Sequence, residues 1–269
     1  LTPRSWGPRQ VGIGVSLAVG CYIATSVALI LIVAAVGADA RVTDVGNAFD
    51  RLAAVAKYAD HKLVAAANKQ PLPSAPHLFA DLTAVKLSFA TTLVYEALLL
   101  TVAGGTAKKN FREFVDSVGL NRFSVTGLWR PAVAVIAAYT IVAVYVVVVK
   151  ALGIDLLTPQ STVPDSVTRD SAAMAMAFVA AVIAAPISEE VFFRGFVFSG
   201  LLKWGFLPAA ACSAALFTVA HLDFGSLIPF FMIGMIMAWL YWSRATLWDS
   251  IVFHFLFNFI SFAALLAGR

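Results

Sequence analysis

The chain has 269 residues, of which 61% are hydrophobic and 13% are charged, and its mean hydropathy is +0.87. Soluble domains average about 45–50% apolar and about 25% charged residues, so this composition excludes a soluble globular protein and indicates an integral membrane protein. The formal net charge of +4 does not indicate a nucleic-acid partner, because the basic residues of a membrane protein mainly set its orientation.

Hydropathy predicts an all-α fold, a polytopic transmembrane helical bundle, since a spanning helix needs about 20 apolar residues. The first apolar segment, 11–37, is longer than the apolar core of about 7–15 residues in a secretory signal, so we interpret it as a retained helix. The expected spanning segments are about seven in number, at 11–37, 82–103, 131–152, 172–200, 206–222, 226–243 and 246–267.

Two polar segments divide the chain. The insertion 38–81 contains apolar residues at helical spacing and ends in "QPLPSAP", which predicts an amphipathic helix on the membrane surface or over the bundle, followed by a turn. The loop 104–130 is basic. We therefore expect an N-terminal unit over 1–130 and a transmembrane catalytic core over 131–269, with its motifs within 189–258.

Basic residues predict the orientation of the bundle, because cytoplasmic loops are rich in Lys and Arg. Arg4, Arg9, the loop 104–130, Lys203 and Arg244 fall on one side if seven helices alternate. We expect a multi-pass protein of the cell membrane with a cytoplasmic N-terminus. Its composition, rich in Ala and Val, suggests a bacterial plasma membrane.

The segment "PISEEVFFRG" (186–195) places three charged residues in an apolar helix. Ionisable residues at such positions are costly in lipid and usually functional. Glu190 and Arg194 have the i,i+4 spacing of an ion pair. Glu189 has no partner on its own helix, and a carboxylate in a low dielectric can act as a general base near neutral pH. Pro186 is expected to kink the helix, and Ser188 to cap its restart.

Two later helices carry further polar groups. At about 1.5 Å per residue, Glu189 and His221 lie roughly 21 and 22 Å from the same membrane face. His254 and Asn258 lie roughly 12 and 18 Å from that face. They share one helix face, so an imidazole and an amide could together donate to an oxyanion. This convergence of depth predicts an active site rather than four separate packing residues.

Several proteolytic chemistries lack their motifs here. The sequence has no H-E-x-x-H zinc helix, no Gly-x-Gly-Asp pair and no Gly-x-Ser-Gly turn. The proteolytic chemistry that remains is one in which a carboxylate and a histidine activate water. The motifs "EEVFFR" (189–194), "FTVAH" (217–221) and "HFLFN" (254–258), in this order, resemble those of the CPBP family. This is the CAAX protease and bacteriocin-processing, or abortive-infection, family, which includes the type II CAAX prenyl endopeptidases.

The resemblance implies an intramembrane endopeptidase that acts on a membrane-associated peptide or protein. Glu189 and His221 would activate water, and His254 and Asn258 would stabilise the oxyanion. Glu190, Arg194 and Phe217 would be supporting residues. Family members are often described as metalloproteases, and Glu189, His221 and His254 are residue types that bind zinc. We prefer a metal-free, glutamate-dependent mechanism, and zinc as a cofactor stays open.

Other interpretations stay open as well. A non-catalytic scaffold or immunity protein of the same fold would tolerate loss of Glu189 or His221, and a proton-coupled transporter would need no peptide cleavage. In the N-terminal half, Glu96 lies at a depth similar to that of Arg194, roughly 12 against 14 Å, so we expect it to share this arginine with Glu190. The two cysteines, Cys21 and Cys212, are expected to be small core residues.

Overall fold

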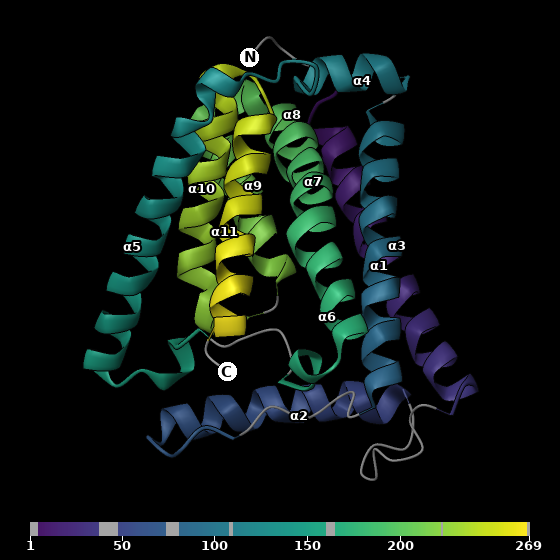
Figure 1. The fold of residues 1–269 in the computed structure, drawn as a ribbon, viewed down its shortest axis with the longest axis vertical. Coiled ribbons are helices and arrows are strands. Elements are labelled where there is room, and N and C mark those ends of the chain that lie inside the picture. Colours follow the sequence, from purple (N-terminus) through teal and green to yellow (C-terminus); the bar gives the residue numbers. More distant parts are fainter. Residues whose placement is uncertain are drawn as a thin grey trace.

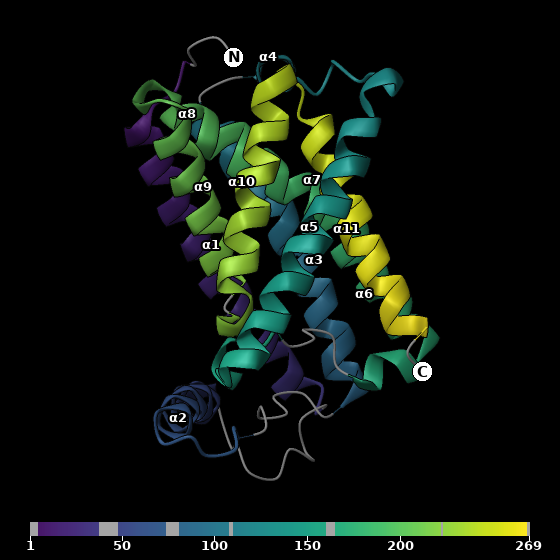
Figure 2. The same cartoon turned by 90° about the vertical axis from the view of Figure 1, so that its left-hand side faces the viewer.

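The computed structural model describes residues 5–37, 48–73, 81–107, 110–159, 165–221 and 223–267, and every regular element in these ranges is a helix. The long helices α1 (Pro8–Ala35), α3 (Leu82–Thr106), α5 (Trp129–Leu152), α10 (Leu227–Arg244) and α11 (Trp248–Ala267) run roughly side by side (Figures 1 and 2). The predicted all-α polytopic bundle is confirmed.

Six helical stretches in the described chain are long and apolar enough to cross a membrane: Pro8–Ala35, Leu82–Thr106, Val125–Leu152, Ser171–Trp204, Phe224–Arg244 and Trp248–Ala267. The seventh segment expected, 206–222, forms the apolar helix α9 (Phe206–Ala220), which has only 15 residues. It is shorter than the roughly 20 residues that a complete crossing needs. His221 therefore lies at the end of a helix rather than within one.

One long helical stretch carries the EEVFFR segment and contains two π-helical segments. It consists of α6 (Ser171–Phe178), a π-helical segment η4 (Val179–Ala184), α7 (Ala185–Glu189), a second π-helical segment η5 (Glu190–Phe198), α8 (Ser199–Leu201) and the 3₁₀ turn η6 (Leu202–Trp204). The wider turns accommodate Pro186 without ending the helix. The prediction that Ser188 caps a new helix is wrong, because its hydroxyl donates back to Ala184 O at 2.7 Å.

Two helices lie across the ends of the bundle. Helix α2 (Ala48–Ala67) runs nearly perpendicular to the long helices at one end, and α4 (Phe111–Val118) lies at the other (Figure 1). The amphipathic helix predicted within 38–81 is present as α2; residues 38–47 and 74–80 of that insertion lie outside the described residues. The remaining elements are the short turns η1 (Val125–Gly127), η2 (Asp155–Leu157), η3 (Asp165–Arg169) and η7 (Phe224–Ser226).

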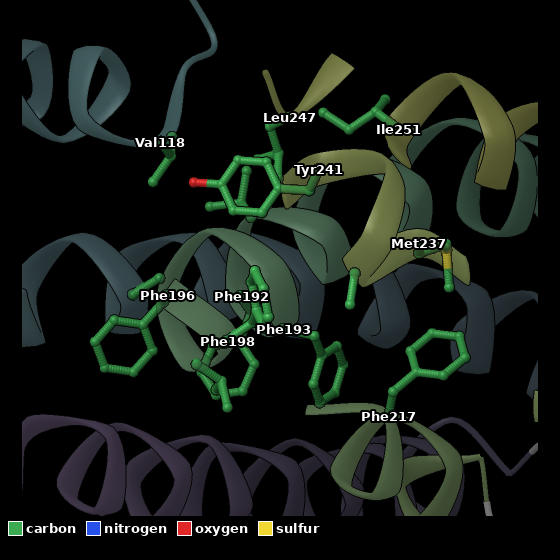
Figure 3. Close-up of a cluster of buried hydrophobic side chains, with 14 of the residues drawn as sticks. Val118, Phe192, Phe193, Phe196, Phe198, Phe217, Met237, Tyr241, Leu247 and Ile251 are labelled. Carbon is green, nitrogen blue, oxygen red and sulfur yellow. The ribbon is translucent and has the colours of Figure 1, made fainter. Parts of the chain in front are cut away.

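The main core lies around η5, whose phenylalanines pack against α9 and α10. Figure 3 shows Phe192, Phe193, Phe196 and Phe198 beside Phe217, Met237 and Tyr241. In contrast, Ile136 on α5 and Leu31 on α1 are more than 60% exposed, as expected for side chains that face lipid. Cys212 on α9 is also exposed, so the prediction that it is a core residue is wrong.

Candidate active site

Glu190 and Arg194 form the ion pair expected from their spacing. Arg194 Nη1 donates to Glu190 Oε1 at 2.8 Å, and both side chains are fully buried. Arg194 Nη2 also donates to Gly234 O on α10 at 3.3 Å. The guanidinium lies over the ring of Phe217, with Cζ 4.5 Å from the ring centroid, which adds a cation–π contact from α9. One cation thus joins three helices.

Glu96 does not share Arg194. Its Oε2 is hydrogen-bonded to Ser188 Oγ at 2.5 Å, and Arg194 is directed to Glu190 and Gly234. The expected contact is therefore wrong. Depth gives the position of a residue along its helix but not the direction of its side chain. Ser188 was predicted to cap a helix, so its contact with Glu96 was not expected.

His221 is held at the end of α9 by its neighbours. Its Nδ1 lies 2.8 Å from Phe217 O, and its ring packs between Phe217 and Phe230, with centroid distances of 4.5 and 4.6 Å. A carbonyl oxygen can only accept, so Nδ1 carries the proton. The neutral ring therefore keeps the lone pair of Nε2 for a ligand or a water molecule.

His254 is held by the ion pair. Its Nδ1 lies 3.3 Å from Glu190 Oε1, the same oxygen that accepts from Arg194. Because the carboxylate accepts from the ring, Nδ1 again carries the proton. His254 Nε2 can then donate to an oxyanion only when the ring is doubly protonated, and it accepts a proton otherwise.

Asn258 is bound to the π-helical turn that precedes the glutamates. In this turn Ala185 N–H donates to Ala180 O, five residues back. The next donor in that register would be Pro186, which has no N–H, so Ala181 O lacks its helical partner. Asn258 Nδ2 donates to this oxygen at 2.7 Å. One of its two N–H groups is thereby committed, and the other remains available.

Two cavities meet between these helices. The aromatic cavity, of about 460 Å³, is lined by Glu189, His221, His254 and Asn258 together with Phe89, Phe217, Phe230, Phe253, Phe257 and Phe262. The hydroxyl cavity, of about 470 Å³, lies between α1, α3 and α9. Four residues line both cavities: Thr92, Glu96, Glu189 and His221.

The structure therefore places all four predicted catalytic residues around one cavity. Glu189 lines it with Oε2 buried and without a hydrogen-bond partner, whereas Glu190, one residue later, is fully buried and contacts Arg194. Glu96, Ser188 and Phe230 also belong to the site, and the sequence alone did not assign these contacts. The depth of Glu96 along its helix was the one sequence feature that pointed to a place near this site.

The donor set does not fit a zinc site. Within the described ranges, no group of three or more His, Cys, Asp or Glu side chains is arranged to hold a metal ion. We therefore assign no catalytic step to a metal.

The fold and this cavity are those of a polytopic helical membrane protein with a buried cluster of polar side chains. Residues 171–260 match the family model for the type II CAAX prenyl endopeptidase Rce1-like proteins, and this part of the chain is a domain of that CPBP family. The match contains the three motifs and begins within α6.

A curated relative supports the same assignment. A Bacillus subtilis (strain 168) protein named Putative membrane peptidase YdiL is 30% identical over 87 residues, which are 32% of this chain and 36% of that protein. The chain thus matches about a third of the length of this relative. No solved structure matches the chain significantly.

Proposed function

We propose that this protein is an intramembrane endopeptidase that hydrolyses a peptide bond in a membrane-associated substrate by a glutamate-dependent mechanism. The observation that carries the proposal is that Glu189, His221, His254 and Asn258 line one cavity in a domain of the CPBP family. A lone buried histidine is usually a packing residue. A carboxylate, two imidazoles and an amide around one cavity are instead typical of an active site.

Glu189 and His221 activate the attacking water. Glu189 Oε2, which is buried and unpaired, takes one proton of the water as its oxygen bonds to the carbonyl carbon, and the lone pair of His221 Nε2 accepts a hydrogen bond from the other O–H. The proton is then delivered to the leaving nitrogen as the C–N bond breaks. The products are a carboxylic acid and an amine.

His254 and Asn258 stabilise the tetrahedral intermediate. The free N–H of Asn258 donates to the oxyanion, and Nε2 of doubly protonated His254 provides a second donor. Glu190 fixes the orientation of His254 through Nδ1 at 3.3 Å, and Arg194 holds Glu190 in turn. Phe217 packs against both His221 and His254, with ring centroids 4.5 and 5.9 Å away.

The test compares bacterial membranes that contain the wild-type protein, Glu189→Gln or His221→Ala at equal levels, with cleavage products identified by mass spectrometry. Loss of a general base typically costs about 10²–10⁴-fold in rate, so products present with the wild type should be absent with both variants. Asp60→Asn, which removes an exposed carboxylate from α2, is the control and should cleave normally.

Unchanged products in Glu189→Gln membranes would contradict the proposal and favour a scaffold or immunity protein. Proton-coupled flux that needs Glu189, without any cleavage product, would favour a transporter.

A further inference from the structure

The hydroxyl cavity offers hydrogen-bond acceptors to whatever enters it. Its lining includes Thr25 and Ser26 of α1 and Ser88, Thr91 and Thr92 of α3. Four of these hydroxyls donate to their own helix, among them Thr25 Oγ1 to Cys21 O at 2.9 Å and Ser88 Oγ to Val85 O at 2.7 Å.

Thr91 and Thr92 complete the pattern on α3. Both hydroxyls donate to Ser88 O at 2.9 Å. A hydroxyl has one proton and two lone pairs, so these oxygens present lone pairs to the cavity and have no proton left to donate.

Acidic side chains are concentrated in the same cavity. Glu96 and Glu189 both line it, and none of the lining residues in the described chain is Lys or Arg. The nearby cations are committed elsewhere, since Arg194 pairs with Glu190 at 2.8 Å and Lys86 pairs with Asp170 at 3.1 Å. Two carboxyl groups in a largely apolar setting, with no Lys or Arg beside them in the cavity lining, ionise at a cost that a cationic ligand would offset.

Two tyrosines add a further attraction for a cation. Tyr22 of α1 and Tyr95 of α3 line the cavity, and their rings meet edge to face with centroids 5.6 Å apart. The faces of aromatic rings attract ammonium and guanidinium groups. The acceptor oxygens, the carboxyl groups and the aromatic faces thus all favour a ligand with an ammonium or guanidinium group.

We propose that the hydroxyl cavity binds a cationic side chain, Lys or Arg, of the substrate peptide near the bond that is cut at Glu189, with Glu96 as the residue that determines this specificity. The proposal rests on the endopeptidase function. Glu96 is suited to this role because it lines both cavities and Ser188, the neighbour of Glu189, holds its Oε2.

The first experiment measures cleavage by the purified full-length protein in detergent micelles. Fluorogenic apolar peptides carry one Lys at successive positions, and each has a partner with the neutral isostere norleucine. A hydrogen bond to a charged group is worth about 1.5–3 kcal/mol, so kcat/KM should be about 10–100-fold higher for Lys at one position.

The variants identify the residues responsible. Glu96→Gln should bring the Lys-to-norleucine ratio close to one, and Thr25→Val, remote from Ser188, should lower it by a few-fold. Thr140→Val is the matched control, because its hydroxyl also donates to the carbonyl four residues back, at 2.9 Å, but lies on an exposed face of α5. It should keep the wild-type ratio. Equal cleavage of both peptides at every position, or an unchanged preference in Glu96→Gln, would overturn the proposal.

A binding experiment separates this proposal from the protease function. Decylammonium chloride should raise the thermal unfolding midpoint of the wild type more than decanol does, and Glu96→Gln should abolish the difference. If no peptide is cut but this difference holds, the cation site stands and the protease function fails. Equal shifts of the unfolding midpoint by the two amphiphiles would overturn the proposal that this cavity binds a cationic side chain. The same shift with NaCl or KCl alone would overturn it as well.

Discussion

The guanidinium of Arg194 is fully buried, and its contacts come from three helices. Glu190 supplies the charge, Gly234 a carbonyl, and Phe217 the face of its ring. Arg194 Nε and Glu190 Oε2 are nevertheless buried without a hydrogen-bond partner. A buried ion pair of this kind costs desolvation, so its value lies in fixing geometry: it orients His254 and brings α9 and α10 to the glutamates.

Glu190→Gln should therefore destabilise the protein strongly. Removing one partner leaves the buried Arg194 without a counter-charge, which typically costs about 3–5 kcal/mol. Unfolding of the purified protein in micelles measures the loss, and the double variant Glu190→Gln/Arg194→Met should lose less than the sum of the two single variants. Glu113→Gln is the control, because Glu113 is exposed and its Oε1 only accepts from Asn110, at 2.9 Å. Equal stability of Glu190→Gln and Glu113→Gln would contradict this reading.

At the scale of the element, hydropathy was sufficient to predict most helices, and depth was sufficient to bring Glu189, His221, His254 and Asn258 together. Both depend on position along the helix axis, which the sequence supplies directly. The π-helical turns could not be predicted in this way, because they change the number of residues per turn while every residue stays helical. The contact between Glu96 and Ser188 was missed because it depends on the direction of each side chain around its helix.

Helices α9 and α10 pack closely at a glycine. A Cβ at Gly234 would lie 2.8 Å from Ala214 Cβ and 2.9 Å from its Cα, so Gly234→Ala should push the helices apart. Such overpacking typically costs about 1–3 kcal/mol and should also weaken the bond from Arg194 to Gly234 O.

Gly20→Ala on α1 is the matched control, because nothing lies within 4 Å of its added Cβ. It should leave the thermal midpoint unchanged or raise it, since alanine favours a helix by about 0.5–1 kcal/mol. A Gly234→Ala protein as stable as Gly20→Ala would contradict the close packing.

The start of α6 gives a prediction for pH. Asp170 is its N-cap and accepts from Ala173 N at 2.7 Å, and this bond, followed by the contact with Lys86, lowers the pKa of Asp170 below its ordinary value. A lowered pKa means that the stabilisation is complete above the ordinary value, about 3.9, and is lost as pH falls through the lower value in the folded protein.

Asp170→Asn isolates this charge, because asparagine also caps helices well. The wild type should be more stable than the variant near neutral pH, and the two stabilities should converge in acid. Thermal unfolding between neutral pH and about pH 3 measures this convergence, over the range where aspartate titrates. A constant difference across the whole range would show that the charge of Asp170 is not involved.

At the scale of the whole molecule, the basic positions from which the orientation is predicted lie at one end of the bundle. The first turn of α1 with Arg9, helix α4 with Arg112, η6 with Lys203 and the end of α10 with Arg244 all lie at this end, whereas α2 and the end of α11 lie at the opposite end (Figures 1 and 2). Helix α2 also carries Arg51, Lys57 and Lys62, but long insertions count less in the positive-inside rule. We therefore propose that the end with α4 is cytoplasmic.

Single cysteines test this orientation, after Cys21 and Cys212 are replaced by serine. Asn121→Cys lies beyond α4, and Asn68→Cys lies beyond α2; both positions are exposed. A membrane-impermeant maleimide should label Asn68→Cys in intact spheroplasts and Asn121→Cys only in inverted vesicles. The opposite pattern would reverse the proposed topology.

The pair of Glu190 and Arg194 also has a consequence for the synthesis of the chain. The helix of residues 171–204 is made before α9 and α10, which provide Phe217 and Gly234, so Arg194 cannot have these contacts when its helix is first made. Glu190 is on the same helix, four residues away, and neutralises the cation from the start. The nascent helix thus carries its own counterion into the lipid, and the later helices add the contacts that place it in the finished protein.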